Sequence, residues 1–183
     1  MPEKKLHNRN ILLITVFSLL ACGLHSLMLY TPFNQYAYTS ALKFALFMLC
    51  PAIYFALANS GRFKDLFSFR GNKKYIKASF FLGIGAFVFI LAAFIAINPL
   101  LDRVMIVGAL SNVGITGENY LFALAYYILI NVALEELFFR GFLFLTLFRM
   151  NVKSYAYIFS GLLFAAYHIS VILCIYAPAS RSV

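Results

Sequence analysis

Long apolar runs are the feature that most constrains this chain. Five of them, each about 20 residues long, follow one another along the 183 residues, and only 11% of the residues are charged. About 20 apolar residues are the length that a helix needs to cross the hydrocarbon core of a bilayer. Soluble domains carry about 25% charged residues, so this chain has too little polar surface for a fold in water. The sequence therefore predicts an all-α polytopic membrane helix bundle, with residues 1–183 forming a single membrane domain.

The runs predict membrane spans at about 11–30, 41–58, 78–97, 126–148 and 155–176. The fourth leaves a choice, because the apolar stretch from Leu121 to Phe148 is too long for one simple span. Tyr126 and Tyr127 are typical interfacial anchors. We therefore expect the membrane part to start near Tyr126, with the residues from Leu121 to Ala125 lying at the surface. A longer, tilted span is the alternative.

Lysines and arginines are distributed unevenly between the loops. They gather at the N-terminus, between the second and third spans and after the fourth, at Lys4, Lys5, Arg9, Arg62, Lys64, Arg70, Lys73, Lys74, Lys77, Arg149 and Lys153. Residues 31–40 carry no charge, and residues 99–120 have Arg103 with Asp102 and Glu118. This asymmetry predicts a cytoplasmic N-terminus and cytoplasmic basic loops. We expect Lys43, near the outer end of the second span, to extend its ammonium group to the interface.

The net charge of +9 does not indicate nucleic-acid binding, because the basic residues lie in short clusters between apolar runs. The cysteines, Cys22, Cys50 and Cys174, lie inside apolar runs and show neither metal-ligand spacing nor a disulfide framework. The N-terminus resembles a signal peptide with a lipoprotein box before Cys22. Its apolar run continues to Tyr30, so a permanent span is the simpler interpretation.

Ionisable residues inside the last two spans are the candidate functional residues. Glu135, Glu136 and Arg140 lie in the fourth span and His168 lies in the fifth. Such groups cost about 2.5–3.5 kcal/mol each near the bilayer centre, and they usually face a protein interior or a water-filled cavity. Glu136 and Arg140 are four residues apart, so they can pair on one helix face. Glu135 points about 100° away and could face a cavity, unpaired.

The fifth span runs back antiparallel to the fourth, so Glu135 and His168 can meet. Helix rise places Glu135 about 14 Å from the outer face, if the span starts at Tyr126, and His168 about 20 Å from the cytoplasmic face of a core about 30 Å thick. These depths agree within a turn or so, which favours the later start. Asn131, one turn before Glu135, is either a cavity wall or an interhelical contact, and we favour the contact. His25 is expected to be incidental.

A carboxylate and an imidazole at one depth, in a site open to water, can activate that water to attack a peptide carbonyl. Glu135 and His168 could instead bind a metal such as zinc. A catalytic zinc needs two or three protein ligands, and the chain supplies few, so no cofactor is required. The structural alternatives are a Glu–Arg pair that holds helices together and a histidine that serves only as an interhelical hydrogen-bond partner.

Two stretches resemble a known family. Asn131-Val-Ala-Leu-Glu135-Glu136-Leu-Phe-Phe-Arg140-Gly141-Phe-Leu resembles the first motif of the CAAX protease and bacteriocin-processing family, also called the ABI family, and Ser160-Gly161-Leu-Leu-Phe164-Ala-Ala-Tyr-His168 resembles its second. The family contains intramembrane glutamate-dependent proteases, among them type II CAAX prenyl proteases, and members linked to bacteriocin self-immunity. The resemblance implies that Glu135 activates water, that Glu136 and Arg140 support it, and that His168 binds the water or the oxyanion. It also implies a site that opens towards the cytoplasm.

The sequence departs from the family pattern after His168. The family has a third motif on a later span, a histidine followed four residues on by asparagine, and residues 169–183 contain neither residue type. The family core usually has about eight spans. The resemblance therefore implies the N-terminal part of a truncated core, which we expect to be weak or inactive as a protease by itself.

The apolar runs predict a multi-pass protein of the cell membrane, and the resemblance implies that it cleaves a peptide or protein substrate near the cytoplasmic side. Whether the chain is an active enzyme stays open at this point. The alternative is a non-catalytic protein that gives bacteriocin self-immunity by binding a partner. A transporter with a proton relay through Glu135 and His168 is disfavoured, because the paired repeats and interrupted helices typical of transporters are missing.

Overall fold

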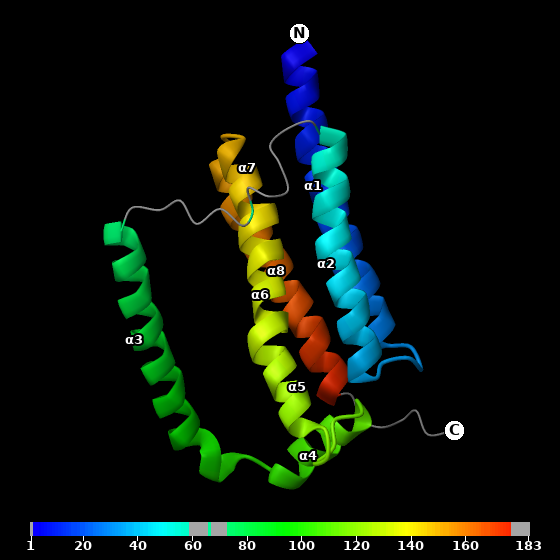
Figure 1. Cartoon of the computed structure of the whole chain (residues 1–183), viewed down its shortest axis with the longest axis vertical. Helices are drawn as coiled ribbons and strands as arrows, with labels where there is room; N and C mark the ends of the chain where they lie inside the picture. The colour runs from blue at the N-terminus through cyan, green and yellow to red at the C-terminus, as the bar shows by residue number, and fades with distance from the viewer. Residues whose placement is uncertain (1, 59–65, 67–72, 177–183) are drawn as a thin grey trace. The chain divides into compact units, whose positions relative to one another are not determined.

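The computed structural model describes residues 2–58, 66 and 73–176. Within these ranges the chain forms helices and no strand, as predicted (Figure 1). In chain order they are α1 (Pro2–Leu29), α2 (Tyr36–Ala58), α3 (Lys73–Ile97), η2 (Asn98–Leu100), α4 (Arg103–Asn112), α5 (Tyr120–Tyr126), η3 (Tyr127–Asn131), α6 (Val132–Glu135), η4 (Glu136–Leu145), α7 (Thr146–Arg149) and α8 (Lys153–Tyr176).

Five helical stretches of the described residues are long and apolar enough to cross a membrane. They are Lys4–Leu29, Tyr36–Ala58, Phe80–Leu100, Tyr120–Arg149 and Lys153–Cys174. The predicted number of spans is confirmed, and the protein is a multi-pass membrane protein. Most of the basic segment between the second and third spans lies outside the described residues, as do residues 177–183. The predicted orientation of the N-terminus stays a prediction.

The fourth span belongs to a long, continuous helix. The helices α5, η3, α6, η4 and α7 follow one another without a non-helical residue, so residues 120–149 form one continuous helix. The residues from Leu121 to Ala125 are the first turns of this helix, and the start of its membrane part near Tyr126 stays a prediction. The η3 and η4 segments are π-helical, with wider turns than an α-helix. We call residues 120–149 the long helix.

The described chain divides into two compact units, residues 1–67 with 109–183 and residues 68–108. The second unit contains α3, an apolar span with a mean hydropathy of 2.8 over its most apolar window. Asn98 and Pro99 continue it as the short helix η2. Asp102 then caps α4, because its Oδ1 accepts hydrogen bonds from the backbone N–H groups of Val104 (2.9 Å) and Met105 (3.1 Å).

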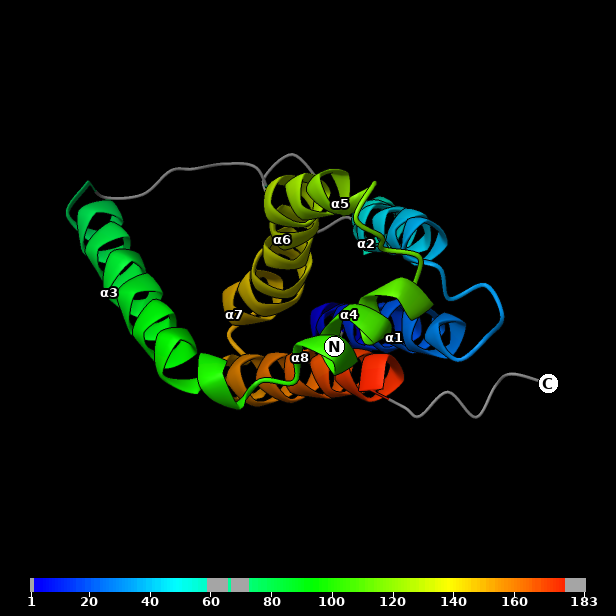
Figure 2. The ribbon, with the colours of Figure 1, turned by 90° about the horizontal axis from the view of Figure 1, so that it is seen from below.

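In the first unit, α1 packs against α2 and α8, while the long helix packs against α2 and α8 (Figures 1 and 2). Hydroxyl pairs link α1 to α8, through Ser26 and Ser170 (2.8 Å) and through Thr15 and Tyr155 (3.0 Å). Such interhelical hydrogen bonds help to hold helices together where lipid supplies no hydrophobic force between them. These contacts bring the middle of the long helix between α2 and α8.

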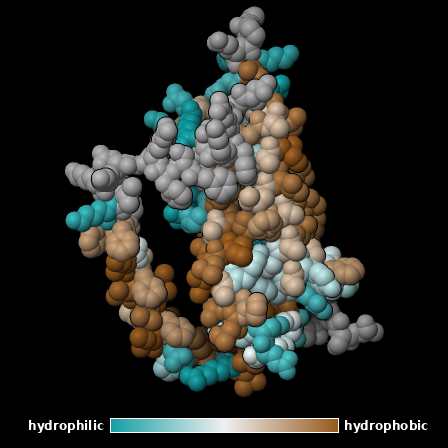
Figure 3. Space-filling model, in the orientation of Figure 1, coloured by the Kyte–Doolittle hydropathy of each residue, from teal (hydrophilic) through white to brown (hydrophobic). Residues whose placement is uncertain are grey.

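Aromatic rings fill the centre of this unit. The ring of Phe47 on α2 stacks on that of Phe138 on the long helix, with centroids 4.1 Å apart and planes 10° from parallel. Phe139 meets Phe47 edge to face at 5.7 Å. Offset stacked and edge-to-face pairs are the favoured geometries of aromatic rings. Apolar side chains also cover most of the middle of the helices on the face shown in Figure 3, as expected for surfaces that meet lipid.

We predict that Phe138→Ala destabilises the protein much more than Phe122→Ala does. Phe138 is fully buried, whereas Phe122 on the same long helix is 86% exposed. Removing a buried phenylalanine costs about 3–5 kcal/mol, because a cavity remains in the core. The fraction of monodisperse protein after heating in detergent, followed by size-exclusion chromatography, measures the difference. Equal loss for both variants would contradict the packing described here.

Candidate functional site

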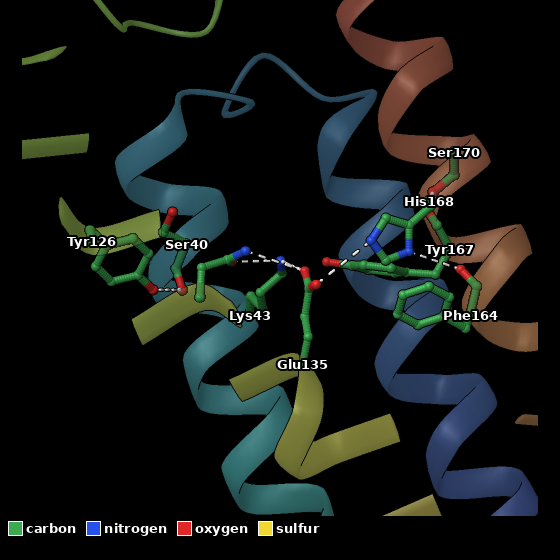
Figure 4. Close-up of polar contacts among 9 residues, drawn as sticks. Ser40, Lys43, Tyr126, Glu135, Phe164, Tyr167, His168 and Ser170 are labelled. Atoms are coloured by element: carbon green, nitrogen blue, oxygen red, sulfur yellow. Dashed lines mark hydrogen bonds and ion pairs between the residues drawn. The ribbon is translucent and has the colours of Figure 1, made fainter. Parts of the chain in front are cut away.

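Glu135 lies where α6 ends and the π-helical segment η4 begins. π-turns inside α-helices occur frequently at functional sites. The long helix carries Glu135 between α2 and α8, and Lys43, Glu135 and His168 point toward one another from these three helices (Figure 4). The candidate site is therefore assembled from three membrane spans.

Lys43 is the cationic partner of Glu135. Its Nζ lies 2.6 Å from Oε1 of Glu135 and donates a second hydrogen bond to Oδ1 of Asn131 at 2.7 Å. The amide nitrogen of Asn131 lies 3.3 Å from the same Oε1. Two expectations are thus wrong. Lys43 does not extend to the interface, and Glu135 is not unpaired.

The position of α2 explains this correction. The helix begins at Tyr36, earlier than the apolar pattern suggested, so Lys43 lies about two turns inside it. The lysine is only 7% exposed. A buried charge is costly unless it is paired and hydrogen-bonded, and both Glu135 and Asn131 meet that need. Asn131 makes the predicted interhelical contact and also lines the site.

His168 approaches the other oxygen of Glu135. Its Nε2 lies 3.6 Å from Oε2, so the two side chains meet at one depth, as predicted. Its Nδ1 lies 3.0 Å from the backbone carbonyl of Phe164, and the Phe164 ring packs on the imidazole at 4.1 Å. A neutral imidazole whose Nδ1–H donates to that carbonyl has an acceptor at Nε2. The geometry therefore presents two proton acceptors to the space beside Glu135.

Glu136 and Arg140 pair with each other, as predicted. Arg140 Nε lies 2.9 Å from Oε2 of Glu136, and the two side chains are 76% and 48% exposed. The pair is thus more exposed than the Lys43–Glu135 pair. Its charges neutralise each other, which lowers the cost of carrying them in a membrane span.

Glu135 lines two cavities of the first unit. The larger, of about 330 Å³, is mostly apolar and reaches from Glu135 and His168 towards the ends of α1 and α2 that flank residues 31–35. The smaller, of about 280 Å³, lies between the long helix and α8 and is also lined by Glu136, Arg140 and Ser160. Ligand sites are typically concave and mostly apolar with a few polar groups, and the larger cavity has this character.

The donor set around Glu135 does not fit a catalytic metal. Among the described residues, no group of three or more His, Cys, Asp or Glu side chains is placed to hold a metal ion. Glu135 and His168 supply two ligands, and the ammonium group of Lys43 is already 2.6 Å from the carboxylate. That ammonium would repel a dication at the same oxygen.

Sequence reasoning missed two further residues of the site. His25, expected to be incidental, is buried, lines the larger cavity, and lies with its ring 5.3 Å from that of Tyr167. Tyr167 is 2% exposed, and its ring extends toward the Glu135 carboxylate (Figure 4). A polar residue one position before His168 gave no signal by itself, because tyrosine is common in apolar helices.

The hydroxyl of Tyr167 is buried and has no hydrogen-bond partner among the described residues. A buried hydroxyl without a partner costs about 1–3 kcal/mol. We therefore predict that Tyr167→Phe leaves the unfolding temperature unchanged or raises it, whereas Tyr167→Leu lowers it by removing ring contacts with Phe47 and Phe139. Thermal unfolding in detergent measures both. A clear loss of stability in Tyr167→Phe would show that the hydroxyl holds a water or another partner.

The comparison with protein families covers this same region. Residues 117–180 match the family described as type II CAAX prenyl endopeptidase Rce1-like. No curated protein and no solved structure matches the chain. The matched residues include both motifs. They therefore include Glu135, Glu136 and Arg140 of the long helix and His168 of α8. About the last third of the chain is therefore similar to the CAAX-type endopeptidase family.

Proposed function

We propose that this protein is a glutamate-dependent intramembrane endopeptidase in which Glu135 and His168 activate water. The observation that carries the proposal is the approach of Nε2 of His168 to Oε2 of Glu135 at 3.6 Å, beside a cavity within the membrane-spanning unit. The family match supports it, since the matched family is one of CAAX-type endopeptidases. The substrate is a peptide or protein segment that reaches Glu135 within the membrane.

The chemistry follows from the two acceptors. A water molecule between them donates one hydrogen to Oε2 of Glu135 and one to Nε2 of His168. Glu135 takes the proton while the water oxygen bonds to the carbonyl carbon of the scissile peptide. The C–N bond then breaks, and the proton passes to the departing amine. General base catalysis of this kind contributes about 10²–10⁴-fold to a rate.

Glu136 and Arg140 have a supporting role in this proposal. Their ion pair at 2.9 Å lines the smaller cavity next to Glu135. A neutralised pair lets the long helix hold Glu135 in the membrane without a further unpaired charge. The pair also places hydrogen-bonding groups where a substrate backbone could approach from the side of α8.

One observation favours a second candidate function. Oε1 of Glu135 is already bound by Lys43 and Asn131, as a purely structural buried ion pair would be. In that case the protein acts without catalysis, by binding a partner in bacteriocin self-immunity. The two functions differ in whether the carboxylate of Glu135 is needed for chemistry.

We predict that purified protein in vesicles, incubated with a peptide mixture in H₂¹⁸O, yields cleavage products with ¹⁸O in the new carboxyl group. Glu135→Gln removes the base but keeps the size of the side chain, so the yield falls by about 10² or more. Mass spectrometry of the products measures both effects. Glu118→Gln is the matched control, because Glu118 is exposed and lies far along the chain from Glu135.

Two results would contradict the proposed protease. The wild-type protein could form no labelled products from any peptide, or the products could persist unchanged in Glu135→Gln. If the wild-type protein gives no products and Glu135→Gln keeps a self-immunity phenotype at normal expression, the partner-binding function is supported instead.

A further inference from the structure

The two oxygens of Glu135 lie in different surroundings. Oε1 is 2.6 Å from Nζ of Lys43 and 3.3 Å from the amide nitrogen of Asn131. Oε2 faces Nε2 of His168 at 3.6 Å. A carboxylate can turn about its terminal bond, because that torsion is broad and roughly two-fold. Some contact must therefore decide which oxygen faces the imidazole.

Lys43 is held firmly enough to make that choice. Its Nζ bridges Glu135 and Asn131, and it lies over the Tyr167 ring at 5.2 Å from the centroid. The Phe47 ring is 6.0 Å from the same nitrogen and is itself stacked on Phe138. A lysine ammonium within about 6 Å of a ring face is attracted to it. The cation is thus fixed from three helices.

We infer that Lys43 is the positioning residue of the site. It occupies Oε1 and keeps Glu135 anionic inside the membrane, so that Oε2 is the oxygen that takes the proton from water. The inference rests on the proposed function, but the ionised state of Glu135 can be tested without a substrate. Asn131 also contacts this carboxylate. Among the described residues, the other titratable groups that line its two cavities are His25, Tyr36, Tyr120, Tyr127, Glu136, Arg140, Tyr167, His168 and Cys174.

A hydrophobic carbodiimide reports the state of Glu135, because it modifies protonated carboxyl groups in membrane proteins. In the wild-type protein at pH 7 we expect little modification of Glu135, as read by mass spectrometry of the peptide that contains it. In Lys43→Met the modification rises at least about tenfold, because the carboxylate loses the cation that lies 2.6 Å from Oε1, and a buried charge without a partner is disfavoured. Lys43→Arg keeps the cation and stays close to wild type.

The chain offers two matched controls. Glu136 lies in the same peptide and pairs with Arg140 rather than with Lys43, so its modification stays constant in every variant. Lys5→Met removes an exposed lysine from α1 and leaves Glu135 unchanged. Equal modification of Glu135 in wild type and Lys43→Met, at any level, would overturn the inference.

Lys43→Met could fail to fold, because it leaves a buried carboxylate without its cation. In that case Glu135→Gln in the Lys43→Met background restores monodisperse protein, and failure of this rescue also overturns the inference.

A measurement of proteolytic activity separates the two proposals. If the wild-type protein forms labelled products and Lys43→Met has the same kcat and KM, the proposed protease is supported and Lys43 has no role in its reaction. A rise of Glu135 modification in Lys43→Met without any proteolysis supports the role of Lys43 in keeping Glu135 ionised and contradicts the protease.

Discussion

Burying a carboxylate in the middle of a membrane span is the constraint on which the site depends. An ionised glutamate at this depth is costly unless a cation and further hydrogen bonds accompany it. Lys43 of α2 supplies the cation at 2.6 Å, and Asn131 binds both partners. The requirement therefore ties α2 to the long helix at one level. His168 on α8 then faces the oxygen that remains.

Packing of the surrounding rings serves the same geometry. Phe47 lies one turn from Lys43 on α2 and stacks on Phe138, which follows Glu135 by three residues on the long helix. The aromatic contact thus fixes the register between the two helices that carry the ion pair. Tyr167 and His168 are adjacent on α8, so the ring that covers Lys43 and the imidazole that faces Glu135 are placed by one helix turn.

Much of this could be predicted from the sequence, for physical reasons. Apolar runs of bilayer length indicated the five spans, and ionisable residues inside them indicated Glu135, Glu136, Arg140 and His168. The spacing of four residues predicted the Glu136–Arg140 pair. Lys43 was misplaced because hydropathy alone put the start of the second span too late, whereas Tyr36 begins a helix that the apolar pattern does not mark. Tyr167 and His25 could not be assigned, since their roles depend on contacts between distant helices.

Helix rise counted from Tyr126 placed Glu135 beside His168 correctly, although the helix itself begins at Tyr120. Depth counted from assumed membrane boundaries ignores tilt and the π-helical turns of η3 and η4, which change the rise along the long helix. Contacts between helices, rather than distance from the interface, set the level of each side chain.

The Lys43–Glu135 contact is the claim on which the rest depends, and solid-state NMR can measure it directly. Protein in lipid bilayers, labelled with ¹⁵N at the lysine Nζ and ¹³C at the glutamate carboxyl, reports dipolar coupling between close lysine–glutamate pairs. The structure predicts a strong coupling that disappears in both Lys43→Met and Glu135→Gln. If the spectra of Lys43→Met and Glu135→Gln both keep every coupling seen in the folded wild-type protein, the site described here is contradicted.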